Sequence, residues 1–521
     1  MMERRQFLKN ALNATTLVGG SAVMAKAGAF PLGAASANMS VGSLAIDTLA
    51  QNQQYYKRFN EALKVKPHLK AWEGVTADIS PTQVSWQGTL PSQMHNHHFY
   101  RNGPGLRVRN KTRYAHWFDG DGLVNQFALH KNGVTHKAKF VETEKYRREE
   151  NAGKFLYSSS GTRIAHAELA KSPQSISQAN TSLLPVNGEL WALWEAAAPY
   201  RVDAETLETK GEQAFSDALK GVPFSAHPHI DRQGNIWNFG KVSLSGQYAF
   251  VIYHLSAAGQ MKQFKLVNTP RDSYVHDFAM TERYLIFYLS PLIKGKRNEV
   301  YTESYSWYGQ KEGRVFVVDK NTLEAVADIP TEPGFVYHFG NSWEQGNALV
   351  VNLCWYDDAY VFKTAMADLV GEQAPNVKSR ASQLVINMTS KTAQLVKSPH
   401  GMEFPMFDAQ FVGQKTQIQT GIIRGSNPAN PRYNTVASYN TQTDNMDAYE
   451  YGENVYVEEP IFVKKQGSNK EGEGYLIHTY LDFIKDQTGV SVFDAQHVAD
   501  GPLATATLPY YLPLGFHGTY V

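Results

Sequence analysis

A hairpin pattern that recurs seven times constrains the fold of this chain more than any other feature. In each copy, a run of alternating apolar and polar residues enters a short polar turn, and a second such run returns. Hairpins repeated at roughly 50 to 70 residues, with no amphipathic helix pattern between them, are typical of a β-propeller. Uneven spacing leaves an irregular β-sandwich assembly as the alternative. We predict an all-β, seven-bladed β-propeller, with hairpins over 123–141, 200–209, 249–267, 314–329, 382–396, 435–449 and 490–508.

Four histidines occupy equivalent places in this repeat. His227, His276, His338 and His517 follow the second, third, fourth and seventh hairpins. The strand after each outer hairpin of a propeller is the innermost strand of the next blade, and its first residues line the central channel. Residues at this place in the repeat therefore converge on the axis. Because neutral imidazole suits Fe, Zn, Cu and Ni, the repeat predicts that the four side chains hold one metal ion.

The remaining histidines are weaker candidates for metal ligands. His229 stands two residues after His227, and in a strand both side chains share one face, so the repeat alone does not separate them. Four more lie before the first hairpin and are interpreted as packing or surface residues without a counterpart in later repeats: His95, His97, His98 and His116.

Three glutamates beside apolar strand segments are candidates for carboxylates close to the metal: Glu195, Glu403 and Glu459. A metal-bound histidine usually donates its second ring N–H to a carboxylate or a carbonyl. Four neutral imidazoles around a divalent ion leave a charge of +2, which buried carboxylates would offset. A surface position at the end of a strand is the alternative for each glutamate, because an unpaired carboxylate is costly to bury.

Charge and cysteine content narrow the classes of partner. The chain has 50 Lys and Arg against 49 Asp and Glu, so it carries no electrostatic footprint for nucleic acid or an anionic membrane face. We therefore expect a small or uncharged ligand and no nucleic-acid partner. Cys354 is the only cysteine, which excludes a disulfide bond within the chain.

The first 37 residues are typical of an export signal. Arg4 and Arg5 precede a weakly apolar stretch over 11–25, and small-residue cleavage sites follow at 25–27, 27–29 and 35–37. This arrangement resembles a twin-arginine signal; a disordered terminus or an ordinary secretory signal is the alternative. The apolar stretch is too short to span a membrane. We predict a periplasmic protein with an export signal over 1–37 and a single propeller domain over 38–521.

Ten short motifs, in order from residue 101 to the C-terminus, resemble those of the carotenoid cleavage oxygenase family. This family includes the lignostilbene dioxygenases and the retinal pigment epithelium isomerase. The motifs are Arg101-Asn-Gly-Pro104, His116-Trp-Phe-Asp-Gly-Asp-Gly122, Ala179-Asn-Thr181, Leu193-Trp-Glu195, Ala226-His-Pro-His229, Val275-His-Asp-Phe278, His338-Phe-Gly-Asn-Ser-Trp-Glu344, Glu403-Phe-Pro405, Glu459-Pro-Ile-Phe462 and Phe516-His-Gly518.

The resemblance implies a seven-bladed propeller with non-haem Fe(II) on its axis, capped by loops and helices that form an apolar tunnel. It implies the ligands His227, His276, His338 and His517, with the histidine before proline favouring His227 over His229. It also implies that three glutamates hold three of these histidines: Glu195, Glu403 and Glu459. Thr181 falls where a threonine of the family partly occludes an open iron position.

The function implied is Fe(II)-dependent cleavage by O2 of one alkene bond in a carotenoid or apocarotenoid, which gives two carbonyl products. A lignostilbene-type dioxygenase is the first alternative, with Lys139 and Tyr146 as candidates to hold a phenolate. A non-cleaving isomerase or carotenoid-binding metalloprotein is the second. Because carotenoids reside in lipid, peripheral membrane contact is also an expectation.

Overall fold

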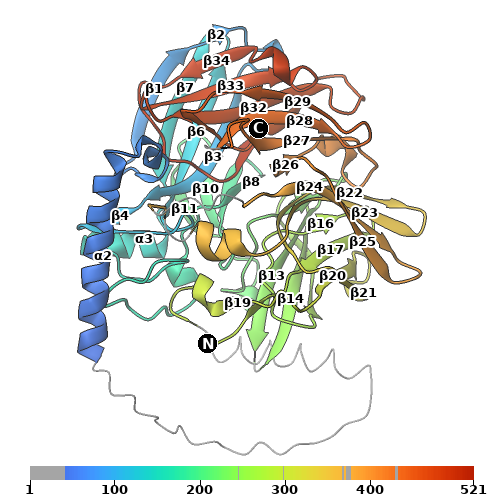
Figure 1. Cartoon of the computed structure of the whole chain (residues 1–521), viewed down its shortest axis with the longest axis horizontal. Coiled ribbons are helices and arrows are strands. Elements are labelled where there is room, and N and C mark those ends of the chain that lie inside the picture. The colour runs from blue at the N-terminus through green and yellow to red at the C-terminus, as the bar shows by residue number, and fades with distance from the viewer. Residues whose placement is uncertain (1–40, 245, 297, 367–368, 371–376, 429–431) are drawn as a thin grey trace, which may run out of the picture.

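Seven β-sheets surround a central axis in the computed structural model of the protein (Figure 1). The structure describes residues 41–521 except 245, 297, 367–368, 371–376 and 429–431. The expected export signal over 1–37 lies outside the described residues. The predicted seven-bladed propeller is confirmed, and the β-sandwich alternative is wrong.

The first three blades use strands from both ends of the chain and from its first half. In order across the sheet, the first contains β35 (Gly518–Tyr520), β3 (His97–Leu106), β6 (Asp121–His130), β7 (Gly133–Phe140) and β1 (Ile79–Ser85). The second contains β8 (Ser182–Val186), β9 (Glu189–Leu193), β10 (Tyr200–Asp203) and β11 (Thr209–Glu212). The third contains β12 (His229–Ile230), β13 (Ile236–Leu244), β14 (Gln247–Leu255) and β15 (Met261–Asn268).

The next three blades follow one another along the chain. The fourth contains β16 (Ala279–Met280), β17 (Tyr284–Leu289), β20 (Gly313–Asp319) and β21 (Glu324–Thr331). The fifth contains β22 (Phe335–Gln345), β23 (Ala348–Tyr356), β24 (Arg380–Asn387) and β25 (Thr392–Lys397). The sixth contains β26 (Glu403–Met406), β27 (Ile418–Arg424), β28 (Tyr433–Asn440) and β29 (Asn445–Glu450).

The seventh blade closes the ring. It contains β30 (Val455–Val457), β31 (Ile461–Lys464), β32 (Gly474–Asp482), β33 (Gln487–Asp494), β34 (Ala504–Thr507) and β2 (Gln87–Gly88). The early strand β2 pairs with β34 in this blade, and the last strand β35 pairs with β3 in the first blade. The ring is therefore closed by backbone hydrogen bonds between strands from the first and the last parts of the propeller.

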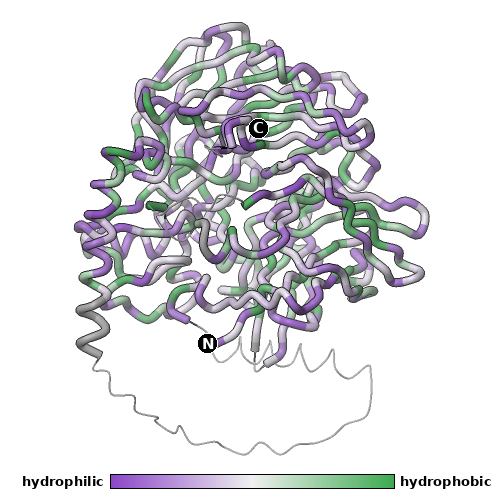
Figure 2. The backbone as a smooth tube through the Cα atoms, viewed as in Figure 1, coloured by the Kyte–Doolittle hydropathy of each residue, from purple (hydrophilic) through white to green (hydrophobic). Residues whose placement is uncertain are grey.

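The seven predicted hairpins are pairs of outer strands in the seven blades: β6–β7, β10–β11, β14–β15, β20–β21, β24–β25, β28–β29 and β33–β34. Alternation along each strand supplies both faces of a blade, because successive side chains point to opposite sides. In β14, Val251 and Tyr253 pack toward the second blade, whereas Phe250 and Ile252 pack toward the fourth. Figure 2 shows hydrophobic and hydrophilic residues interleaved along the strands.

A cap of short elements lies over one end of the axis, as predicted. Its longest helix is α2 (Val41–Leu63), which is followed by η1 (Pro67–Trp72). The other elements outside the blades are β4 (Val108–Arg109), β5 (Thr112–Arg113), α3 (Glu144–Ala152), β18 (Leu292–Lys294), β19 (Tyr305–Trp307) and the π-helix η6 (Val361–Ala365). Single turns of 3-10 helix complete the fold: η2 (Ser92–Met94), η3 (Gln174–Ile176), η4 (Asp217–Leu219), η5 (Thr302–Ser304), η7 (Ala409–Phe411) and η8 (Val498–Asp500). Among the described helices, none is long and apolar enough to cross a membrane.

The backbones of residues 103 and 515 lie in close contact near the point where the ring closes, and this contact requires glycine at position 103. A Cβ added at Gly103 would lie 2.3 Å from the Cα of Gly515, two residues before His517. Gly103→Ala should therefore displace this segment and lower the free energy of unfolding by about 1–3 kcal/mol, measured by chemical denaturation. Gly295→Ala is the matched control, because its Cβ would meet only a carbonyl oxygen at 3.9 Å. Equal stability of the two variants would contradict this assignment.

Candidate metal centre

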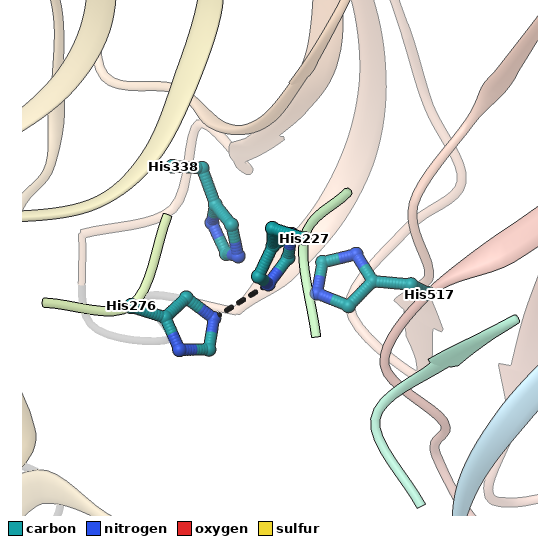
Figure 3. Close-up of side chains that lie close together, drawn as sticks. All are labelled: His227, His276, His338 and His517. Carbon is teal, nitrogen blue, oxygen red and sulfur yellow. Dashed lines mark hydrogen bonds between the residues drawn. The ribbon is translucent and has the colours of Figure 1, made fainter. Parts of the chain in front are cut away.

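The four predicted histidines meet on the propeller axis (Figure 3). His227 precedes β12, His276 precedes β16, His338 lies in β22 and His517 precedes β35. One ring nitrogen of each lies within 4.8 Å of the corresponding nitrogens of the other three. The side chains come from four different blades and point toward one another, as convergence of the inner strands requires.

The spacing of the rings suits a single ion. Two imidazole nitrogens that bind one ion at about 2.0–2.1 Å are at most about 4.2 Å apart. The Nε2 atoms of His227 and His276 are 2.8 Å apart. The ring centres of His338 and His517 are 5.1 Å apart, and each of these rings lies within 5.3 Å of the ring of His227. Small side-chain adjustments are enough for all four Nε2 atoms to bind one ion.

Three of the four histidines donate a hydrogen bond from Nδ1, the ring nitrogen that faces away from the centre, to one of the predicted glutamates. His338 Nδ1 lies 2.6 Å from Glu403 Oε2, and His517 Nδ1 lies 2.8 Å from Glu459 Oε1. His276 Nδ1 forms the same hydrogen bond with Glu195 Oε1. An ionised carboxylate only accepts, so each Nδ1 carries the proton and each Nε2 presents a lone pair to the centre.

The fit of a cation to these residues is supported by an unpaired atom. His338 Nε2 is buried and has no hydrogen-bond partner among the described residues. A buried polar atom without a partner is costly, and a metal ion at the centre would supply that partner. An all-nitrogen donor set without thiolate suits the divalent ions of iron, zinc, copper and nickel.

The electrostatics of the site favour the neutral form of two of the ligands, His227 and His517. Burial lowers the pKa of His227 and of His517 well below the ordinary value, and the neighbouring histidines lower both further. Burial also acts to lower the pKa of His338, but the adjacent Glu403 outweighs it and leaves that pKa raised. Burial raises the pKa of Glu459 to about 7 although Arg101 lies 3.6 Å away. A divalent ion at the centre would favour the ionised form of this carboxylate.

Further residues that the sequence reasoning missed hold the glutamates. Tyr274 Oη donates to Glu195 over 2.6 Å, and Tyr356 Oη donates to Glu403 over 2.6 Å. Tyr274 precedes His276 by two residues, so an extended segment places both side chains on one side, which is a signal that the sequence contained. Tyr356 ends β23, which pairs with β22, the strand that carries His338. The sequence alone does not reveal the register of this strand pair.

The other histidines have separate roles, as interpreted. His229 Nε2 pairs with Asp277 Oδ1 at 3.0 Å and does not belong to the group of four. His116 Nδ1 accepts a hydrogen bond from the backbone N–H of Phe118. His97 stacks on Tyr520 with ring centres 5.2 Å apart. The structure thus separates His227 from His229, which the repeat alone does not.

Thr181 stands beside the centre, and its backbone is bonded to one of the four histidines. Its hydroxyl donates to Asn180 Oδ1 over 3.2 Å, and its carbonyl accepts from the backbone N–H of His517. Its side chain lines the cavity above the histidines. Partial occlusion of an open metal position by this threonine stays a prediction.

Two residues near the centre have backbone conformations that side chains rarely adopt. Phe404, directly after Glu403, has φ of 51°, and Ala179, two residues before Thr181, has φ of 47°. Such conformations are costly and persist where the surroundings determine them. The Phe404 N–H donates to Glu403 Oε2 over 3.0 Å, and its ring stacks on His338. This strain helps to fix the glutamate that orients the histidine.

A cavity of about 410 Å³ lies between the histidines and the cap. Its wall is rich in aromatic residues: Trp72, Trp117, Phe118, Trp194, Tyr301, Tyr337, Tyr356, Tyr360, Phe404, Tyr433, Tyr456 and Phe516. His276, His338 and His517 form part of its floor. The arrangement can hold a flat apolar molecule against a metal ion. Lys139 and Tyr146, considered from the sequence as phenolate-binding residues, are not among the described residues that line this cavity, so that prediction is wrong.

Comparison with known proteins decides the family. The family model of the retinal pigment epithelial membrane protein matches residues 73–521. The chain belongs to this family, that of the carotenoid cleavage oxygenases. It is 27% identical over 459 residues to the apocarotenoid-15,15'-oxygenase of Synechocystis, with 83% of this chain and 92% of the relative covered. It is 24% identical over 497 residues to the lignostilbene-alpha,beta-dioxygenase isozyme III of Sphingomonas paucimobilis, with 87% and 98% covered.

The family's fold is the one described above. A solved structure of a mutant of the Synechocystis apocarotenoid oxygenase superposes with a TM-score of 0.79 at 23% identity, covering 88% of this chain and 99% of that one. This chain and the Synechocystis enzyme therefore share the propeller fold. In this chain, that fold carries the four histidines and the three glutamates.

The metal centre is tested by comparing two kinds of variant. His276→Ala removes a ligand and should abolish stoichiometric metal binding, measured by elemental analysis of the purified protein. Glu403→Gln removes only the charge behind His338 and should weaken metal affinity by roughly 10- to 100-fold. His229→Ala is the matched control and should retain the metal. Stoichiometric metal in the His276 variant would contradict the four-histidine site.

Proposed function

We propose that this protein is an Fe(II)-dependent dioxygenase that cleaves an alkene C=C of a carotenoid or apocarotenoid into two carbonyl products. The observation that carries the proposal is a centre of four convergent histidines beneath a cavity rich in aromatic residues. Fe(II) bound by the four histidines would supply the site where O2 is activated next to the double bond. Membership in an oxygenase family, and the similarity to the apocarotenoid oxygenase, support the same activity.

The protein's own residues bind, orient and exclude water. The aromatic walls hold a rigid conjugated chain and fix which bond lies above the histidines. The glutamates hold the imidazoles in one tautomer. Burial of the centre keeps water from competing with the substrates. In this proposal no side chain acts as an acid or a base, because the reaction adds both oxygen atoms of O2 across one bond.

A lignostilbene-type dioxygenase, which would cleave the interphenyl double bond of a phenolic stilbene, is the second candidate. The similarity to the lignostilbene dioxygenase covers nearly the whole of that relative. The two candidates share the centre and differ in the shape and polarity of the substrate that the cavity accepts.

The activity is tested with anaerobically purified, iron-loaded protein. Incubation with an apocarotenal and with a hydroxylated stilbene under 18O2 should give labelled aldehydes from the preferred substrate, detected by mass spectrometry. Products from the apocarotenal support the first candidate and products from the stilbene support the second. Bound iron with no cleavage of either would contradict both and favour an isomerase or a binding protein.

We also propose that the protein is exported to the periplasm by a twin-arginine signal over residues 1–37, on the basis of Arg4, Arg5 and the apolar stretch that follows. Such export moves folded proteins, so the metal would be inserted before translocation. Replacing both arginines with lysine should retain the protein in the cytoplasmic fraction of a bacterial host, measured by fractionation and immunoblotting. Unchanged periplasmic recovery would contradict the proposal.

A further inference from the structure

The cavity wall carries a guanidinium with two nitrogen atoms that have no hydrogen-bond partner in the described part of the protein. Nε and Nη1 of Arg424 are buried and have no hydrogen-bond partner among the residues that the structure describes. The guanidinium lies against the ring of Tyr433, with Cζ 5.3 Å from the ring centre. Arginine stays protonated in proteins, so this position holds a positive charge. Arg424 is half-buried, and withdrawing a charge from water without an anionic partner is costly.

The other charged side chains of the cavity are already engaged. Glu195, Glu403 and Glu459 accept hydrogen bonds from the metal-site histidines. Glu458 accepts from Thr479 and from the backbone N–H of Gly515. Among the described carboxylates of the wall, each therefore has a structural partner.

The second arginine of the wall is engaged as well. Arg432 donates through Nη1 to the Glu453 carbonyl over 3.1 Å and through Nε to Tyr456 Oη over 3.3 Å. The contrast with Arg424 indicates that the two arginines differ in purpose. Arg432 ties the wall together, whereas Arg424 has donors left for a ligand.

Strand register places Arg424 away from the histidines but in the same cavity. Ile422 lies opposite Glu403 in the pairing of β26 with β27, and both Ile422 and Arg424 line the cavity. Arg424 is two residues further along, on the same face, which is roughly 7 Å of strand. Since Glu403 begins β26 and Arg424 ends the antiparallel β27, both stand at the sheet end that faces the cavity. A rigid substrate over the histidines would reach Arg424 with a distant group.

We propose that Arg424 binds a carboxylate at the end of the substrate remote from the cleaved double bond, so that the substrates are conjugated alkenes with an acid group. The inference rests on the proposed function and names its substrate class. A carboxylate matches the guanidinium in charge and forms strong charge-assisted hydrogen bonds with it. A phenol offers the same kind of oxygen, but with a pKa near 10 it is uncharged at neutral pH. The carboxylate is therefore the group that compensates the half-buried charge of Arg424.

Anaerobic binding tests this inference without any need for turnover. The iron-loaded protein is titrated with retinoic acid and with methyl retinoate, and quenching of tryptophan fluorescence is followed, because Trp72, Trp117 and Trp194 line the cavity. Stilbene-4-carboxylic acid and its methyl ester form a second pair with a shorter conjugated system. In the natural protein, one acid should bind roughly 10- to 100-fold more tightly than its ester.

Variants assign that preference to one side chain. Arg424→Gln should abolish the preference for the acid and leave affinity for the ester unchanged, and Arg424→Lys should retain part of it because the charge remains. Arg232→Gln is the control for the loss of one positive charge, because Arg232 is exposed and pairs with Glu282 at the surface. This variant should bind both members of each pair like the natural protein.

Four results would overturn the inference. Equal affinity for acid and ester in the natural protein, or an undiminished acid preference in Arg424→Gln, contradicts a carboxylate site and leaves the oxygenase proposal standing. If Arg424→Gln does not fold, an undiminished preference in Arg424→Lys has the same meaning. Failure of both acids and both esters to bind would contradict the proposed function together with this inference.

Discussion

The hydrogen bonds from histidine Nδ1 atoms to buried glutamates are the interactions on which the site depends. Each bond fixes a tautomer, aims an Nε2 lone pair at the axis and gives a buried carboxylate a partner. Each also joins two blades, since Glu403 of the sixth blade holds His338 of the fifth, and Glu459 of the seventh holds His517, which precedes the inner strand of the first. Site geometry and ring geometry are therefore maintained by the same contacts.

The propeller brings one residue from each blade to the axis. At or just before the first residues of the seven inner strands stand, in blade order, His517, Thr181, His227, His276, His338, Glu403 and Glu459. Four of these residues can bind a metal, two orient such ligands, and one lines the space above them. The ring explains this division of roles. Glu403 and Glu459 stand next to the histidines that they hold, and Thr181 leaves one side of the centre open to the cavity.

Much of this could be predicted from the sequence because it follows from periodicity. Alternation and turn residues mark each outer hairpin, and the place after each hairpin marks an inner strand, so the blades and the four histidines were accessible before any coordinates. The choice of His227 over His229 was not accessible from the repeat, because a strand puts both on one face; the chain turns so that His229 meets Asp277. Glu195 lies after β9 rather than at the start of an inner strand, so the repeat did not place it at the axis; its apolar surroundings and its motif made it a candidate.

Features that depend on register or tertiary contact were not predictable. Tyr356 of the fifth blade donates a hydrogen bond to Glu403 of the sixth, and the local sequence around either residue does not indicate the other. The left-handed backbone at Phe404 runs against the preference of an aromatic residue and appears only in the structure. Arg424 closes an ordinary strand pattern, and its unsatisfied donors become visible only when the whole cavity is assembled.

The most direct test of the account is X-ray absorption spectroscopy of the protein reconstituted anaerobically with Fe(II). We expect a first coordination layer around the iron that includes four imidazole nitrogens, with the multiple scattering that histidine rings produce, and no sulfur. A layer with fewer than three imidazoles, or one dominated by carboxylate oxygens, would contradict the convergence of His227, His276, His338 and His517 on one ion.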